Sequence, residues 1–303
     1  MKTISGLIAA TFTPMHADGT LNLDAVPSIV DRMVQYKLGG LYVNGSTGEG
    51  PLLTTEERKA TAEAYVRAAA GRIPVIVQAG HASNREARGL AEHAAAIGAD
   101  ALSALPPIYF KPDSLEMLIA CLKEVVSGAP DLPFYYYHIP TVTNVTFDMR
   151  ALLRAVSDQI PSFAGVKFSS HMLPEFQGCI DQAHGRYQMF LGVDDLCISG
   201  HALGSSGAVG TTYSFMAPLF QKAMAAYDAG DAKGAFALQV EAGRIVTKML
   251  EFKGMAGLKA VMKMIGLDCG PCRLPLHTLS PEEYASLNVA LEKLDFFEKW
   301  AMT

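Results

Sequence analysis

The sequence predicts an α/β fold, a (β/α)8 TIM barrel with a C-terminal helical extension, from three observations. Short β-branched or aromatic runs alternate with longer helical patterns eight times within residues 1–215, which is close to the usual size of such a barrel. No Gly-x-Gly-x-x-Gly follows the first strand, which disfavours a doubly wound sheet. After residue 215 the pattern becomes purely helical. We therefore expect one domain over 1–303, in which 216–303 is a helical extension packed on the barrel.

The first four units begin with a strand at 8–13 and an amphipathic helix whose apolar stripe includes Ile29 and Met33. A glycine-rich turn ends the second strand, and Thr54 or Thr55 caps the next helix, which has acidic residues in its first turn. The strands of these units are expected at 8–13, 40–44, 74–79 and 99–105, and the helices at 23–38, 54–71, 84–97 and 114–126.

The second half of the barrel repeats this rhythm, and the extension then follows. Strands are expected at 132–137, 163–168, 187–191 and 208–212, with helices at 147–156, 174–183 and 196–203. The extension contains helical patterns at 216–228, 231–252, 257–265 and 281–300, and a loop at 268–280. No low-complexity linker separates it from the barrel.

The composition limits the possible functions. The chain is 50% hydrophobic with a net charge of −5, which gives no electrostatic footprint for nucleic acid or an anionic membrane. No 18-residue apolar stretch and no signal peptide are found, so neither a membrane span nor secretion is expected. Five cysteines at scattered positions fit a reducing compartment, and a cytoplasmic protein is expected.

Lys167 is a charged residue within the apolar run 163–168. An ammonium group is costly to bury without a partner. The lysine therefore either reaches solvent from an edge strand or is kept for its amine, because burial lowers a lysine pKa and a neutral amine can attack a carbonyl.

Polar residues at the ends of other strands favour the second interpretation, since the active site of such a barrel lies at the carboxyl ends of its strands. These residues are Ser46 and Thr47 after the second strand, Tyr137 and His138 at the fifth, Asp194 and Asp195 after the seventh, and Thr211 and Thr212 at the eighth.

Three motifs resemble the N-acetylneuraminate lyase and dihydrodipicolinate synthase superfamily. They read Gly-Ser-Thr-Gly-Glu at 45–49, Tyr-His-Ile-Pro at 137–140 and Gly-Val-Lys-Phe at 165–168, in the right order and on the right strands. The resemblance covers nearly the whole chain. It implies a pyruvate-dependent class I aldolase, usually a homotetramer, without metal or organic cofactor.

Within the superfamily, the run 134–140 resembles the N-acetylneuraminate lyases most. Dihydrodipicolinate synthases usually carry an arginine at the position of Val142, and an apolar side chain cannot replace a guanidinium. The lyases usually have glutamate at the position of Asp195 and often serine at that of Thr211. Asp195 is one methylene shorter than glutamate, which leaves the exact sugar specificity open. Thr211 is a milder change, because it keeps the hydroxyl.

The resemblance implies a mechanism and roles. Lys167 forms a Schiff base at C2 of N-acetylneuraminate, and a retro-aldol step releases N-acetylmannosamine and leaves pyruvate. Tyr137 is the acid/base for the C4 hydroxyl, and Ser46 and Thr47 hold the carboxylate. Tyr109 matches a tyrosine that the synthases donate across a subunit interface. The residues implied to bind the sugar chain are Ser169, Gly192, Asp194, Asp195 and Thr211.

Two other functions stay open. The first is another pyruvate-dependent aldolase or hydratase-aldolase that acts on a 2-keto-3-deoxy sugar acid, since it needs the same Lys167 and Tyr137. The second is a non-catalytic sugar-acid binder, which should have lost the lysine or the tyrosine.

Three further features are interpreted as structural. The Cys-x-x-Cys pair of Cys269 and Cys272 lies in a loop between extension helices, which disfavours a redox role, and the pair lacks the further ligands that zinc needs. Glu49 is expected to bond backbone around its own turn. Strand alternation turns His138 away from the side of Tyr137, which favours packing or an interface.

Overall fold

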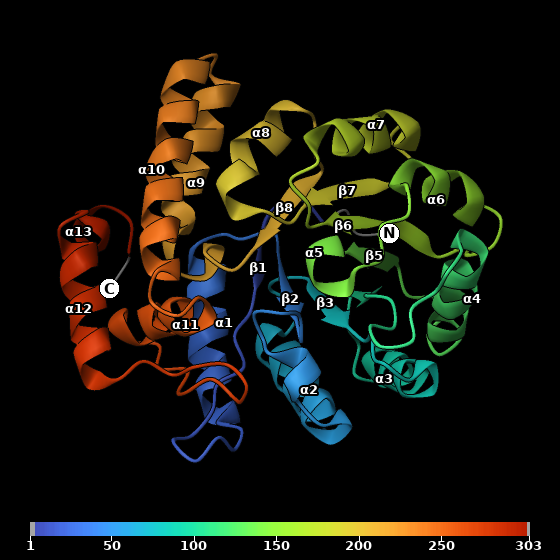
Figure 1. Ribbon diagram of the computed structural model, residues 1–303, viewed down its shortest axis with the longest axis horizontal. Coiled ribbons are helices and arrows are strands. Elements are labelled where there is room, and N and C mark those ends of the chain that lie inside the picture. Colours follow the sequence, from blue (N-terminus) through green and yellow to red (C-terminus); the bar gives the residue numbers. More distant parts are fainter. Residues whose placement is uncertain (1–3, 302–303) are drawn as a thin grey trace.

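Eight parallel strands form a closed barrel in which each strand pairs with its neighbours in the chain and β8 pairs with β1. The computed structural model describes residues 4–301 and confirms the predicted barrel (Figure 1). The strands are β1 (Gly6–Ala10), β2 (Gly40–Val43), β3 (Val75–Gln78), β4 (Ala101–Ala104), β5 (Phe134–His138), β6 (Phe163–Phe168), β7 (Gln188–Leu191) and β8 (Gly207–Gly210).

Helices surround the strands in chain order (Figure 1). Thr54 caps α2 as expected: its hydroxyl accepts from the backbone N–H of Glu57, whose carboxylate accepts in return from the N–H of Thr54. The helices are α1 (Val26–Gln35), α2 (Thr55–Ala69), α3 (Asn84–Ala96), α4 (Leu115–Val126), α5 (Pro140–Thr143), α6 (Met149–Val156), α7 (Leu173–Ala183), α8 (Cys197–Ala202) and α9 (Tyr213–Asp228), with short 3-10 turns η1 (Leu23–Ala25), η2 (Gly50–Leu52) and η3 (Asp194–Leu196).

Side chains fill the barrel interior, and alternate positions on each strand point into it or out to the helices. Tyr135 and Tyr137 belong to the inner apolar cluster, whereas His138 packs outside it. At the amino-terminal end of the strands, Tyr135 Oη donates to Gln188 Oε1 at 2.6 Å. Gln188 Nε2 in turn donates to the carbonyl of Ile4 at 2.6 Å. The barrel interior is therefore a packed core, and the place for an active site is at the carboxyl ends of the strands.

Two strands end two or three residues earlier than the sequence predicts. The strand expected at 8–13 ends at Ala10, and the strand expected to reach residue 212 ends at Gly210. Beyond the end of β1, Thr11 N–H still donates to the carbonyl of Tyr42 at 3.1 Å, and Thr13 Oγ1 donates to the carbonyl of Gly48 in the turn after β2 at 2.6 Å.

Helix α9 covers the barrel next to α1. It contacts β1, and Gln221 Nε2 donates to the carbonyl of Tyr36 at 2.6 Å. The helix is kinked at Met216, two residues before Pro218, which lacks the N–H that a regular helix needs. The expected boundary after residue 215 falls within this helix, and the division of the chain at that point stays a prediction.

The remaining helices stand together on one side of the barrel (Figure 1). The expected helix at 281–300 is two helices, because Asp295 has a φ of 52° and interrupts it. No helix of residues 4–301 has both the length and the apolarity to cross a bilayer. The extension helices are α10 (Ala232–Leu250), α11 (Met255–Met264), α12 (Pro281–Glu292) and α13 (Phe296–Lys299).

Candidate active site

Lys167 lies in β6 with only 4% of its surface exposed. Its Nζ atom is 3.9 Å from the ring centroids of both Tyr42 and Tyr137, and within residues 4–301 no carboxylate forms an ion pair with it. Burial lowers the pKa of the Lys167 ammonium below its usual value, although Tyr137 and Asp194 act in the opposite direction. A lysine in this setting can supply the neutral amine that attacks a carbonyl.

Tyr137 lies directly beside Lys167, because β5 and β6 pair in a register that matches these two residues. Its hydroxyl is 3.3 Å from Ser46 Oγ, and its ring meets the edge of Tyr42 at a centroid distance of 5.6 Å. The structure therefore brings a buried amine, a phenol and a serine hydroxyl together at one end of the barrel.

The turn that follows β2 is folded tightly on itself. The backbone N–H of Glu49 donates to the carbonyl of Ser46, and that of Gly50 donates to the carbonyl of Gly45, both at 3.0 Å. A Cβ atom on Gly50 would lie 2.0 Å from the carbonyl oxygen of Asn44, so only glycine fits there. Asn44 and Glu49 have φ angles of 62° and 55°, which are uncommon for residues other than glycine. This strained backbone fixes the direction of the hydroxyls on the turn.

Two further hydroxyls and a carboxylate lie at the ends of β7 and β8. Thr47 Oγ1 is 2.6 Å from Thr211 Oγ1, which joins the turn to the end of β8. Asp194 Oδ2 accepts from the N–H and the hydroxyl of Thr212 at 2.8 and 2.7 Å. Burial raises the pKa of Asp194, and the bonds from Thr212 oppose this shift. A Cβ atom on Gly210 would lie 2.3 Å from Asp194 Oδ1, so this glycine allows the carboxylate its position.

The other three residues that the sequence predicts for the sugar chain are divided between two places. Ser169 and Gly192 adjoin each other, since a Cβ atom on Gly192 would lie 2.1 Å from Ser169 Oγ. Asp195 is exposed and lies against α10, where a Cβ atom on Gly243 would be 3.9 Å from its Cβ. The Cβ atom of Asp195 is thus next to the C-terminal extension.

Sequence reasoning did not single out Tyr42, although its ring forms one wall around the Lys167 amine. Tyr42 Oη lies 2.9 Å from Ser103 Oγ, which donates to the carbonyl of Tyr135 at 2.8 Å. Burial raises the pKa of Tyr42 well above its usual value. The alternation of side chains along the second strand could have placed this tyrosine inside the barrel.

Arg58 was also missed, because an arginine on an amphipathic helix is normally exposed. It is 1% exposed, and its guanidinium donates to the carbonyls of Gln78 and Gly80 at 2.7 and 2.9 Å. Its own carbonyl accepts from Asn44 Nδ2 at 2.8 Å. Burial lowers the pKa of Arg58 to about 10. Arg58 therefore joins α2 to both the end of β3 and the turn after β2.

The prediction that His138 points away from Tyr137 is confirmed. His138 packs against Phe168 with ring centroids 4.9 Å apart, outside the barrel interior. Burial lowers the pKa of His138 to about 4, so its imidazole is neutral at physiological pH. This fits packing.

Large apolar side chains are exposed near the carboxyl end of the barrel. Tyr109 and Phe110 are 81% and 86% exposed, and their rings meet edge to face at 5.0 Å. Val142, which stands where the synthases usually have arginine, is 62% exposed in α5. In a single copy of the chain, most of the Tyr109 surface is therefore available to contact a partner.

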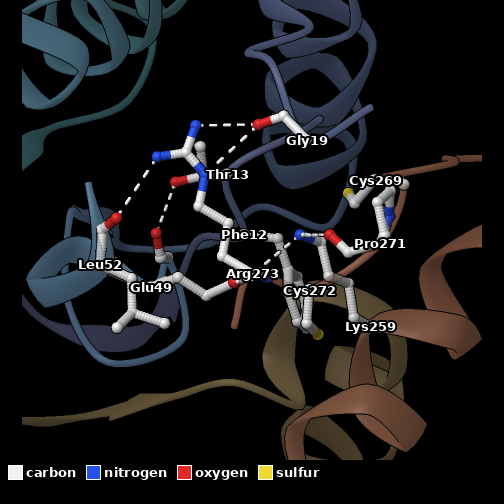
Figure 2. Close-up of polar contacts among 12 residues, drawn as sticks. Phe12, Thr13, Gly19, Glu49, Leu52, Lys259, Cys269, Pro271, Cys272 and Arg273 are labelled. Atoms are coloured by element: carbon white, nitrogen blue, oxygen red, sulfur yellow. Dashed lines mark hydrogen bonds and ion pairs between the residues drawn. The ribbon is translucent and has the colours of Figure 1, made fainter. Parts of the chain in front are cut away.

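The expectation for Glu49 was wrong. Its carboxylate does not bond the backbone of its own turn but contacts the C-terminal extension (Figure 2). Oε1 accepts from Lys259 Nζ and Oε2 from the backbone N–H of Arg273, both at 2.7 Å. These partners are more than 200 residues away in the chain, so no local sequence pattern could predict them.

The Cys-x-x-Cys pair lies in the loop between α11 and α12, as predicted. Burial raises the pKa of Cys269 to about 12 and that of Cys272 to about 11, which is the opposite of what a reactive thiol needs. In the described part of the chain, no three His, Cys, Asp or Glu side chains come together as a group that could hold a metal ion.

Comparison with known proteins places this geometry in context. Residues 3–294 match the model of the dihydrodipicolinate synthetase family. N-acetylneuraminate lyase A of Xenopus laevis is 40% identical over 299 residues, which is 97% of this chain and 98% of that protein.

Solved structures agree with this match. The N-acetylneuraminate lyase of Proteus mirabilis has a TM-score of 0.94 at 34% identity and covers 97% of this chain and 100% of its own. A catalytic lysine mutant of the Ruminococcus gnavus sialic acid aldolase has a TM-score of 0.92 at 29% identity, over 98% of this chain and 97% of its own.

Proposed function

Because the chain belongs to the dihydrodipicolinate synthetase family, we propose that it is an N-acetylneuraminate lyase, which cleaves N-acetylneuraminate to N-acetylmannosamine and pyruvate. The observation that carries the proposal is the Lys167 amine, buried between two tyrosine rings without a carboxylate partner in the described chain. The names of full-length relatives at up to 40% identity support the choice of substrate.

Lys167 is the nucleophile in this proposal. Its neutral amine adds to the C2 carbonyl of the open-chain sugar acid. The adduct takes up one proton and loses water to give a protonated imine, and the final hydrolysis returns that proton. The imine accepts the electron pair of the breaking C3–C4 bond, so the aldehyde N-acetylmannosamine leaves. Protonation of the resulting enamine at C3 and hydrolysis of the imine release pyruvate and restore the amine. No metal or organic cofactor is needed for these steps.

Tyr137 is the acid/base. Its oxygen takes the proton of the substrate C4 hydroxyl during cleavage while its own proton moves to Ser46 Oγ, 3.3 Å away, and the enamine later takes a proton back at C3. Position supports this role, because Tyr137 pairs with Lys167 across neighbouring strands and so faces the same bound carbon chain.

The substrate carboxylate is held by Ser46, Thr47 and backbone N–H groups of the turn after β2. The link between Thr47 and Thr211 at 2.6 Å supports a fixed direction for these hydroxyls. The sugar chain then runs toward the ends of β6, β7 and β8. There it is bound by Ser169, Gly192, Asp194, Asp195 and Thr211.

We further propose a homotetramer that works in the cytoplasm. The exposed rings of Tyr109 and Phe110 support burial against another copy of the chain, since exposed apolar clusters mark interaction surfaces. Cysteines without disulfides support a reducing compartment.

The deciding experiment measures pyruvate release from N-acetylneuraminate in parallel with 2-keto-3-deoxygluconate. We expect clear release from N-acetylneuraminate and a much lower rate with the other acid. Preference for 2-keto-3-deoxygluconate would assign the protein to the related sugar-acid aldolases. Substrate binding without any pyruvate release would indicate a non-catalytic binder.

A further inference from the structure

The C-terminal extension holds the turn that carries Ser46 and Thr47. The contact runs through Glu49, two residues after Thr47, whose two carboxylate oxygens both bind groups from the extension (Figure 2). One is the ammonium of Lys259 in α11, and the other is the backbone N–H of Arg273 in the following loop. The turn itself offers Glu49 no such partner.

The pair between Glu49 and Lys259 is sealed from solvent. The two side chains are 0% and 1% exposed, and Lys259 Nζ also donates to the carbonyl of Pro271 at 2.6 Å. An ion pair in such surroundings is little screened, and removal of one partner leaves an uncompensated buried charge. The loop, the helix and the turn are therefore linked by one ammonium group.

The turn needs external support because its backbone is strained. Glu49 has a left-handed φ of 55°, which a residue with a Cβ atom adopts at a cost. Such conformations persist when surrounding contacts hold them. For Glu49 those contacts come from the extension.

Arg273 fixes the same loop on the far side of the turn. Its guanidinium binds the carboxylate of Glu57 in α2. It also donates to the carbonyls of Gly19 and Leu52 at 2.8 and 3.3 Å (Figure 2). The loop is thus tied to residues that precede the turn in the chain and to residues that follow it.

Packing alone gives this loop incomplete support. A cavity of about 820 Å³ lies beneath it, lined among others by Lys259, Pro271, Ser280 and Tyr284. A loop beside open space relies on its polar contacts to stay in place. The buried bonds from Lys259 and the bonds from Arg273 are among those contacts.

We propose that Lys259 is a positioning residue for the reaction: through Glu49 it holds the Ser46–Thr47 turn in the geometry that binds the carboxylate of the 2-oxo acid. Lys259 does not touch the substrate. The inference rests on the proposed function, and it assigns the C-terminal extension a role in substrate binding. It also predicts which kinetic quantity changes when the pair is lost.

Three variants test the proposal: Glu49→Gln, Lys259→Met, and the double variant with both changes. Glu49→Gln keeps the size of the side chain and removes its charge. The double variant leaves neither charge unpaired, so it should fold even if Lys259→Met does not. Thermal unfolding of each variant reports its stability.

The readout is borohydride trapping of pyruvate on Lys167 over a range of pyruvate concentrations. We expect the half-saturating concentration to rise about tenfold to 100-fold in the folded variants, because small displacements of binding groups have effects of that size. The trapped fraction at saturation should match the wild type, since Lys167 is intact. In the double variant stability should recover while the half-saturating concentration stays raised.

Lys263→Met is the matched control. It lies one turn further along α11 and removes an exposed ion pair with Asp268 in the same loop. Its half-saturating concentration should stay within about twofold of wild type. A folded Glu49→Gln or double variant with wild-type half-saturation would overturn the positioning role. Absence of trapping in the wild type would instead overturn the proposed function.

Discussion

Lys167 and Lys259 are both buried lysines, yet their ammonium groups have opposite surroundings. Lys167 lies between two tyrosine rings in the barrel, and no carboxylate of residues 4–301 forms an ion pair with it. Lys259 lies in the extension, and its ammonium donates hydrogen bonds to the Glu49 carboxylate at 2.7 Å and to the carbonyl of Pro271 at 2.6 Å.

The difference predicts that only one of the two buried lysines can act as a nucleophile. A buried lysine with a carboxylate partner keeps a compensated charge and serves as a structural link. A buried lysine without one has its charged form disfavoured and becomes available as an amine. We therefore expect Lys167→Met to lose catalytic activity and Lys259→Met to lose stability.

Lys167→Met should have the largest effect on catalysis. Without the amine no imine forms, so pyruvate release from N-acetylneuraminate should fall by more than about 10³-fold. The variant should stay folded, because the change removes a buried ammonium that lacks a carboxylate partner. Pyruvate release within tenfold of wild type would contradict the assigned nucleophile.

Tyr137→Phe should separate the two steps of the reaction. The turnover number should fall about 10²-fold to 10⁴-fold, since the proton acceptor for the C4 hydroxyl is lost. Borohydride trapping of pyruvate on Lys167 should persist. If trapping is lost to the same degree as turnover, Tyr137 acts on imine formation and not on the cleavage step.

Lys259→Met should cost mainly stability. It leaves Glu49 buried without its cation, and we expect the free energy of unfolding to fall by about 3–5 kcal/mol. Lys263→Met, whose ion pair with Asp268 is exposed, should change it by less than about 1 kcal/mol. Denaturant titration of both variants gives the comparison. Equal losses of unfolding free energy in the two variants would show that the buried ion pair stabilises the fold no more than the exposed one.

The smallest effect concerns pH. Burial lowers the pKa of Lys167 in the folded protein, whereas the unfolded chain keeps its usual value. Between these two values the unfolded chain binds more protons, so wild-type stability should rise with pH relative to Lys167→Met. The gain should be complete once the pH exceeds the unfolded value of about 10.4. A difference that does not change with pH would show that the fold leaves this pKa unperturbed.

Much of the fold could be predicted because local sequence patterns determine most of its strands and helices. Alternating runs and capping residues such as Thr54 predict every strand and most helices at nearly their observed places, although the short helix α5 was not predicted. The errors arise where tertiary contacts override the pattern. Thr13 turns out of the first strand to bind Gly48, and Asp295 interrupts the last helix with a positive φ.

The candidate site was predictable where its residues lie at strand ends. Lys167 and Tyr137 could be paired from strand order alone, and the register matches them. Arg58 and the pair of Glu49 with Lys259 could not be predicted, because each depends on contacts between distant parts of the chain and on a degree of burial that charged residues rarely have.

The most direct test is borohydride reduction in the presence of pyruvate, followed by peptide mapping with mass spectrometry. The contrast between the two buried lysines predicts a reduced pyruvyl group on Lys167 and none on Lys259. A label on Lys259 or on another lysine, or no label at all, would contradict the central claim that the unpaired buried lysine is the nucleophile.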